Sequence, residues 1–327
     1  MNNTGITRLE NVIVPELFAP YVIKRTMEKS ELIHSGIVSN SAEFDNLAAG
    51  PSATVNLPYW DDLIGDSETI QDDGWLTPER IIANLDVATK HGRDKAWGAN
   101  GLSAQMSGDD PISAIGNLVA DYWGRQYQKV LLATLEGVFA SESMEDKIHD
   151  ISSKSGENGL ISGSTFIDAM QKMGDSKENL SGIMINSAVE AYLAKRELIE
   201  YVQEAGQSDR IPVFLNKRVV VDDGMPFDTA TNTGVAYIFG NGAIALGNGS
   251  HPRIVNYEVM RDHLASSGED VLITRHIFIL HPRGIRWTGN NIQKIFPDFE
   301  EMKNGQNWSR VYEPKAIRIV KFVFKIK

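Results

Sequence analysis

Residues 110–140 read DPISAIGNLVADYWGRQYQKVLLATLEGVFA, and this stretch decides the fold of the chain. Pro111 has the place of a first helical residue, and Asp110 stands where a capping side chain belongs. Apolar residues then recur at the spacing of one helix face. They are Ile112, Ile115, Leu118, Val119, Tyr122, Tyr127, Val130, Leu131, Leu135, Val138 and Phe139. The pattern predicts one amphipathic helix, a rod of roughly 42 Å from Pro111 to Val138, whose apolar stripe should pack on a β-sheet of the same chain.

The composition limits the classes of protein to which the chain can belong. Its 327 residues suffice for one large or two ordinary domains, and 42% hydrophobic with 23% charged residues fits a globular protein. With 32 Lys+Arg against 43 Asp+Glu, the formal charge is −11, a poor basis for tight nucleic-acid binding. No apolar run approaches the roughly 20 residues of a membrane span, and no signal peptide is evident. The absence of cysteine excludes disulfides and thiolate sites. We expect a cytoplasmic product of a cell, or of something that replicates in one.

A long hairpin is expected before the helix. Apolar and polar residues alternate over Ser52–Leu57 and again over Ile81–Val87, which predicts two strands. The connection between them, Tyr59–Glu79, has about 20 residues, a length that tends to be functional. A two-stranded hairpin of this kind is barely stable alone, so we expect a neighbouring subunit to complete its burial. Trp60, Trp75 and Trp97 fall on or beside it, and the contact candidates are Trp60, Asp61, Asp62, Trp75 and Arg80.

The chain after the helix reads as an α/β region followed by strands. Residues 141–163 form a polar break, and a helix over Thr165–Met173 ends at Gly174. The strand Ile183–Ile185 leads into a capping box at Ser187–Glu190 and a helix to about Val202. Further strands are predicted at Pro212–Leu215, Arg218–Asp222, Val235–Phe239, Ala243–Leu246, Arg253–Met260, Val271–Leu280 and Gly284–Trp287, with a half-buried final strand over Val320–Ile326.

Four groups of residues resemble sites but have a simpler interpretation. Gly240–Ala245 matches G-x-G-x-x-A, yet β-compatible residues follow instead of the required helix, which favours a tight hairpin turn around Asn241 and Gly242. The acidic residues of 61–73 fit no EF-hand spacing. The run Asp222–Gly224 is typical of a turn. The seven histidines show no metal-ligand spacing, and a strand would place His276 and His281 on opposite faces. We therefore expect no catalytic, cofactor-binding or metal-binding residues and no enzyme.

The order of these elements resembles that of the major capsid proteins of tailed bacteriophages, the Hong Kong 97-type fold. The residues that carry the resemblance are Val12–Pro15 with Glu16–Met27, the hairpin from Thr54 to Tyr59, the helix from Pro111, Val219–Pro226 (VVVDDGMP), and Tyr237–Gly240 (YIFG) leading to His251 and Pro252. The resemblance spans nearly the whole chain and implies an α+β fold. Its parts would be an N-terminal arm (1–50), an extended hairpin loop or E-loop (51–97), and a peripheral domain (98–163) with a spine helix (110–140). An axial domain (164–250) and returning strands of both domains (251–327) would follow.

The resemblance implies a coat protein that self-assembles into pentamers and hexamers of an icosahedral shell around double-stranded DNA. The shell would assemble in the host cytoplasm and form the virion capsid, without a membrane. The acidic charge fits an inner wall that holds packaged DNA without sequence-specific binding. Partners would be further copies of the chain, with separate scaffolding, portal and decoration proteins. The loop 59–79 has no lysine, so we expect no Lys–Asn crosslink there, Lys90 and Lys95 being the nearest candidates. The alternatives are an encapsulin-type nanocompartment shell and a cytoplasmic α/β enzyme that uses Gly240–Gly242 for a nucleotide.

Overall fold

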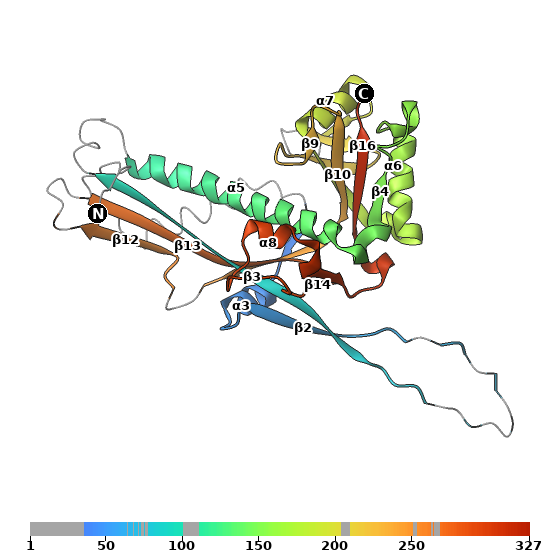
Figure 1. The fold of residues 1–327 in the computed structure, drawn as a ribbon, viewed down its shortest axis with the longest axis horizontal. Helices are drawn as coiled ribbons and strands as arrows, with labels where there is room; N and C mark the ends of the chain where they lie inside the picture. The colour runs from blue at the N-terminus through green and yellow to red at the C-terminus, as the bar shows by residue number, and fades with distance from the viewer. Residues whose placement is uncertain are drawn as a thin grey trace.

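The computed structural model describes residues 36–63, 65–67, 69, 70, 72, 75, 78–100, 111–203, 210–250, 254–262, 264 and 269–327. Expectations for residues 1–35, for Asp110 and for His251 and Pro252 lie outside this part of the chain. Figure 1 shows an elongated molecule in which one long helix lies along a sheet, a second sheet stands at one end of that helix, and a hairpin projects away from both.

The long helix is confirmed as α5, Pro111–Ala140, with 30 residues and a length of roughly 45 Å. Its apolar side chains pack on a β-sheet, as the pattern predicts: Trp123 stacks on His276 at 4.0 Å between ring centroids, and Tyr127 lies 4.3 Å from Phe278. Leu118 was expected in this stripe, but its side chain is 66% exposed.

A six-stranded sheet lies beneath α5 in the order β1-β11-β13-β3-β2, with β12 also paired to β13. Its strands are β1 (Val38–Asn40), β2 (Thr54–Trp60), β3 (Ala83–Asn100), β11 (Ile244–Gly249), β12 (Tyr257–Asp262) and β13 (Glu269–Pro282). Helix α3 (Ala42–Ala49) packs on the face opposite α5, where Phe44 and Ala48 join a small core with Ile279. The sheet is therefore covered on both faces at its middle.

An eight-stranded sheet forms the second part, in the order β4-β16-β10-β5-β8-β7-β6, with β9 paired to β10. Its strands are β4 (Ile148–Asp150), β5 (Leu180–Ile185), β6 (Glu200–Gln203), β7 (Arg210–Phe214), β8 (Lys217–Val221), β9 (Phe227–Asp228), β10 (Thr233–Gly240) and β16 (Ile319–Lys325). Helices α6 (Gly163–Met170) and α7 (Ser187–Lys195) share one core with its Ile183, Ile238 and Phe322. The predicted final strand is confirmed as β16, which lies between β4 and β10.

Short elements connect these parts. They are the 3₁₀ helices Glu142–Lys147, Gly156–Gly159, Gln171–Asn179, Gly305–Asn307 and Pro314–Ala316, the helix α8 (Phe299–Lys303), and the pair β14 (Ile285–Trp287) and β15 (Trp308–Arg310). Helix α8 packs on α5, and Lys303 of α8 forms an ion pair with Glu136 at 3.2 Å. The helix expected to end at Met173 becomes a 3₁₀ helix after Met170, with Gly174 at a positive φ of 60°.

Three predictions of local structure are wrong. The helix from Ser187 ends at Lys195, and the stretch predicted to continue it forms strand β6, paired with β7. Its N-cap is Asn186, whose side chain accepts a hydrogen bond from the Ala188 amide, so the predicted capping box does not cap it. The turn at 241–242 is present, but it joins two sheets instead of closing a hairpin, because β10 and β11 pair with different partners.

The face that β3 buries also differs from the expected pattern. The alternation over Ile81–Val87 predicts the strand correctly, but Leu85 is 38% exposed while Asp86 and Ala88 are buried. Asp86 is buried because it has polar partners: His281 Nε2 lies 2.9 Å from its Oδ2, and the Gly284 amide donates to the same atom. A hydrophobic pattern does not detect a buried carboxylate that is paired in this way.

Candidate functional site

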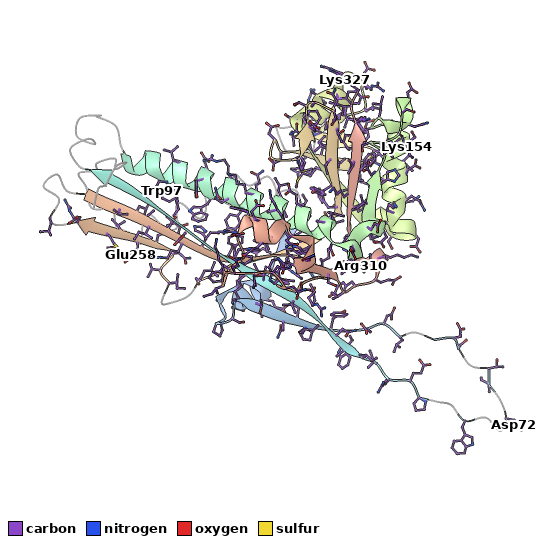
Figure 2. All side chains as sticks on the ribbon, in the orientation of Figure 1. Asp72, Trp97, Lys154, Glu258, Arg310 and Lys327 are labelled. Carbon is purple, nitrogen blue, oxygen red and sulfur yellow. The ribbon has the colours of Figure 1, made fainter. Side chains whose placement is uncertain are left out.

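The hairpin is the part of the molecule that presents the candidate contact residues. Its strands pair from Thr54 opposite Thr89 to Trp60 opposite Ala83, and the chain continues beyond this ladder to a tip near Asp72 (Figure 2). At about 3.3 Å per residue, the paired part alone is about 20 Å long. The tip therefore lies well away from both sheets (Figure 1).

Apolar side chains on the hairpin are exposed to an unusual degree. The exposed fractions are 67% for Trp60, 80% for Leu63, 98% for Ile70 and 95% for Trp75. Single exposed apolar residues are normal on a protein surface, but a group of them on one projecting element marks an interaction site. Sequence reasoning identified the two tryptophans and missed Leu63 and Ile70, because it followed only aromatic and charged residues.

The charged candidates lie on the same element. Asp61 accepts a hydrogen bond from Asn84 Nδ2 at 2.5 Å, and its amide donates to Ile82 O, which holds the two strands together just beyond Trp60. Asp62 caps the amide of Leu63 at 2.8 Å, and Arg80 is exposed. All five candidates therefore share the hairpin. Trp97, expected on or beside it, lies at the opposite end of β3 against Tyr122 of α5 (Figure 2).

Contacts at the root of the hairpin fix its direction. Tyr59 donates a hydrogen bond to Val311 O at 3.1 Å, and its ring meets Tyr312 edge-on at 4.7 Å. Two positions further from the tip along the ladder, buried Asp86 contacts His281 and Gly284. Two segments outside the hairpin, 281–284 and 311–312, thus hold its root.

A pocket lies at the base of the hairpin. It has a volume of about 240 Å³ and is lined mainly by apolar side chains, among them Ile254, Ile277, Ile295 and Phe296. The Lys90 side chain also lines it, with Nζ donating to Gly50 O at 2.6 Å, and burial lowers the pKa of this ammonium. No local sequence pattern indicates this pocket, since its residues come from five segments that are distant along the chain.

The remaining motifs have structural roles. Gly240–Ala245 passes from strand β10 through a turn into strand β11, so the helix that a dinucleotide site requires does not follow it. Asp222–Gly224 is a turn, with Met225 N donating to Asp222 O at 3.1 Å. His276 and His281 lie on opposite faces of the sheet, as predicted: His276 stacks under α5, and His281 pairs with Asp86 on the other side.

The described residues form neither a metal-binding cluster nor a membrane-spanning helix. No cluster of three or more His, Asp or Glu side chains in this part of the chain is arranged to hold a metal ion. No helix in it is long and apolar enough to cross a membrane.

Comparison with known proteins gives a close relative of full length and more distant structural neighbours. No protein-family model matches the chain. The major capsid protein of Bacillus phage SPP1 is 43% identical over 326 residues, covering 98% of this chain and 99% of the relative.

Three solved structures share the fold at low identity. The capsid of Ralstonia phage GP4 matches with a TM-score of 0.56 at 10% identity, over 100% of this chain and 96% of that one. The cyanophage Pam1 capsid matches with a TM-score of 0.53 at 10% identity and the same coverage. Mycobacterium phage Che8 matches with a TM-score of 0.52 at 12% identity, over 98% of each chain. These likenesses support the expected α+β fold of the Hong Kong 97 type, and neither an encapsulin-type compartment nor a nucleotide-using enzyme is favoured. With its full-length relative at 43% identity, the chain belongs to the major capsid proteins of bacteriophages, and its place is the capsid of the virion.

Proposed function

We propose that the chain builds pentamers and hexamers of an icosahedral shell around double-stranded DNA, and that its hairpin is the main contact between subunits. The observation that carries this proposal is the hairpin itself, which extends beyond its own fold with Leu63, Ile70 and Trp75 at least 80% exposed. An element that is barely stable alone and keeps its apolar side chains in water gains stability when another molecule covers them.

The contact residues in this proposal are Trp60, Asp61, Asp62, Trp75 and Arg80, joined by Leu63 and Ile70. Tryptophan and arginine are the residue types that most often dominate the free energy of an interface. The carboxylates of Asp61 and Asp62 beside Trp60 would need basic or hydrogen-bond-donating groups on the partner surface.

The two sheets have different roles in the proposed shell. The six-stranded sheet with α5 is the peripheral domain, α5 its spine, and the hairpin its E-loop. Residues 1–50 were expected to form the arm, but β1 and α3 within this range pack into the six-stranded sheet. The eight-stranded sheet is the axial domain around the capsomer axes. β11, within the range 164–250 expected for the axial domain, pairs in the six-stranded sheet, and β16 pairs in the eight-stranded one, so the chain passes between the two parts more than once.

The partners follow from the same proposal. Copies of the chain are the principal partner, with separate scaffolding, portal and decoration proteins. The net charge of −11 supports an inner wall that weakly repels DNA, so that packaged DNA makes no sequence-specific contact. The relationship to a structural protein supports a chain without enzymatic activity. The absence of lysine from 59–79 supports a shell without a Lys–Asn crosslink in this loop.

Electron microscopy of the purified protein, with light scattering on the same sample, tests the proposal. We expect closed shells, or rings of five or six subunits. A double variant, Ile70→Ser with Trp75→Ser, should stay folded by circular dichroism and monomeric by light scattering, and should form neither shells nor rings. The matched control is Ile167→Ser, which removes a 49% exposed isoleucine from α6 and should leave assembly unchanged. A wild-type protein that stays strictly monomeric at high concentration would contradict the proposal.

A further inference from the structure

The pocket at the base of the hairpin is large enough for an aromatic side chain. It lies on the sheet face opposite α5: Phe278 packs under α5, and its neighbour Ile277 points to the other face and lines the pocket. The C-terminal end of α3 and the segment around Phe296 form its other walls. An apolar cavity of about 150 Å³ holds a benzene molecule, so about 240 Å³ leaves room for a larger ring.

Lys90 places a positive charge in the wall of the pocket, which an occupant would have to neutralise. Its side chain is 2% exposed, and its ammonium donates to the carbonyl of Gly50. Among the residues that the structure describes, no carboxylate pairs with it, and burial alone lowers its pKa. A buried ammonium without an anion is costly. An occupant that carries a carboxylate beside an aromatic ring would satisfy both the cavity and the charge.

The hairpin tip carries this combination, but it cannot reach the pocket of its own chain. Trp75 is 95% exposed, and Asp72 lies close to it in sequence and is also exposed. The pocket adjoins the Thr89 end of the ladder, whereas the tip lies beyond the Trp60 end, about 20 Å further along. Figure 2 shows Asp72 at the far end of the hairpin. A hairpin that fills the pocket must therefore come from another molecule.

We propose that the pocket between α3 and Phe296 receives Trp75 from the hairpin of a second copy, with Asp72 of that hairpin facing Lys90. This inference rests on the proposed function and names the receiving surface for the hairpin. Trp60 is a weaker candidate for the pocket because it stands within the ladder, opposite Ala83, where the paired strand limits its approach. The isoleucines at the rim, Ile254 at 39% and Ile295 at 77% exposed, would be covered by the same contact.

Disulfide trapping tests the contact directly, because the chain has no cysteine of its own. One variant carries Asp72→Cys and Ser52→Cys, the second at an exposed position that lines the pocket. After assembly and mild oxidation, we expect a ladder of covalent oligomers on a non-reducing gel. The matched control pairs Asp72→Cys with Lys154→Cys, an exposed position beside the eight-stranded sheet (Figure 2), and should give no ladder.

Substitution of Lys90 separates its proposed role from a purely structural one. In Lys90→Met, the isolated subunit should melt at the same temperature or higher, because an unpaired buried charge is removed. The protein concentration needed for assembly should nevertheless rise roughly tenfold or more. A lower melting temperature with unchanged assembly would show that Lys90 only supports the fold, and would overturn its role in the contact.

The outcomes distinguish the inference from the proposed function. Shells that assemble normally but give no ladder would overturn the inference and leave the proposed function intact. Absence of any assembly by the wild-type protein would contradict the proposed function itself.

Discussion

At the scale of single residues, Gly137 shows how closely α5 approaches the segment from α8 to β15. The indole Nε1 of Trp308 donates to Met302 O at 2.7 Å, directly against the helix. A Cβ atom at position 137 would lie 1.9 Å from that carbonyl oxygen and 2.7 Å from the indole nitrogen. Only glycine fits here, although glycine is unfavourable inside a helix.

We expect Gly137→Ala to lower the free energy of unfolding by about 2 kcal/mol or more, because the backbone of α8 must move to admit the methyl group. Gly124 offers a control within the same helix, since a Cβ there meets nothing within 4 Å. Gly124→Ala should stabilise the subunit by up to about 1 kcal/mol through helix propensity alone. Urea unfolding of the monomer measures both. Equal effects would show that the contact with Met302 does not limit position 137.

His91 makes the subunit sensitive to acid. Its ring is fully buried against Phe278, and burial lowers its pKa from 6.5 to about 3. As the pH falls below 6.5, the unfolded chain takes up a proton that the folded chain excludes. Stability is therefore full above pH 6.5 and falls progressively towards pH 3.

We expect His91→Phe to lose about 2 kcal/mol less stability than the wild type between pH 6.5 and pH 5, at 1.36 kcal/mol per pH unit. Urea unfolding at several pH values provides the measurement. The acid sensitivity that remains should include His276, whose pKa burial lowers to about 4. Parallel pH profiles for the variant and the wild type would contradict this explanation.

At the scale of elements, Asp86 sets the direction of the hairpin. Its carboxylate joins β3 to His281 at the end of β13 and to the Gly284 amide in the following turn, and all three groups are buried from water. Tyr59 adds a contact to Val311 from the other strand. The hairpin is thus fixed at its root, while the described residues near its tip, Ile70 and Trp75, are almost fully exposed.

Asp86→Ala should lower the free energy of unfolding by about 3 kcal/mol, because it leaves a buried imidazole and a buried amide without their acceptor. Asp94→Ala, at an exposed position of the same strand, should change it by no more than about 0.5 kcal/mol. Chemical denaturation of the isolated subunit compares them. Similar values would mean that the root contacts contribute little to the fold.

The sequence predicted the elements whose apolar residues recur at a regular spacing, and it failed where a tertiary contact decides between helix and strand. The 30-residue helix α5 was predicted almost to its ends, because its apolar stripe is long and Pro111 marks its start. The prediction that the helix continues after Lys195 was wrong. Residues 200–203 are compatible with a helix, but they form strand β6 by pairing with β7, and this tertiary contact cannot be read from the local sequence. The turn at 241–242 was recognised from its residues, but strand partners decide which sheet each flanking strand joins.

The contact surface was predictable only in part, for a similar reason. Trp60 and Trp75 were expected to contact a neighbouring subunit because they are aromatic residues on a long hairpin that is barely stable alone. Lys90, Ile277 and Phe296 gave no such signal, since each belongs to a different segment and only the folded sheet brings them to one pocket. Local patterns identify what an element presents, whereas a receiving surface assembled from several elements requires the fold.

At the scale of the whole molecule, α5 joins the two sheets through one continuous core. The C-terminal half of the helix contributes Leu131, Leu135 and Phe139 to a cluster that includes residues of both sheets. From the eight-stranded sheet come Met184, Val220, Tyr237 and Ile319, and from the six-stranded sheet Ile244, Phe278 and Leu280. Because this core is shared, the face of each sheet that contributes to it is buried only when the other sheet is also folded, and the described part of the chain should unfold as one unit.

Leu193→Ala tests this cooperativity. Leu193 of α7 is fully buried in the core of the eight-stranded sheet, and its truncation should cost roughly 2–5 kcal/mol. All six tryptophans lie outside residues 148–249 and 311–327, so tryptophan fluorescence reports on the other part of the molecule. With one cooperative unit, the variant shifts the urea midpoint of fluorescence as far as that of far-ultraviolet circular dichroism. Ile167→Ala, at a 49% exposed position on α6, is the control and should shift neither appreciably. A fluorescence midpoint that stays in place while the dichroism transition splits would show that the two sheets unfold independently, and that α5 connects them without coupling their stability.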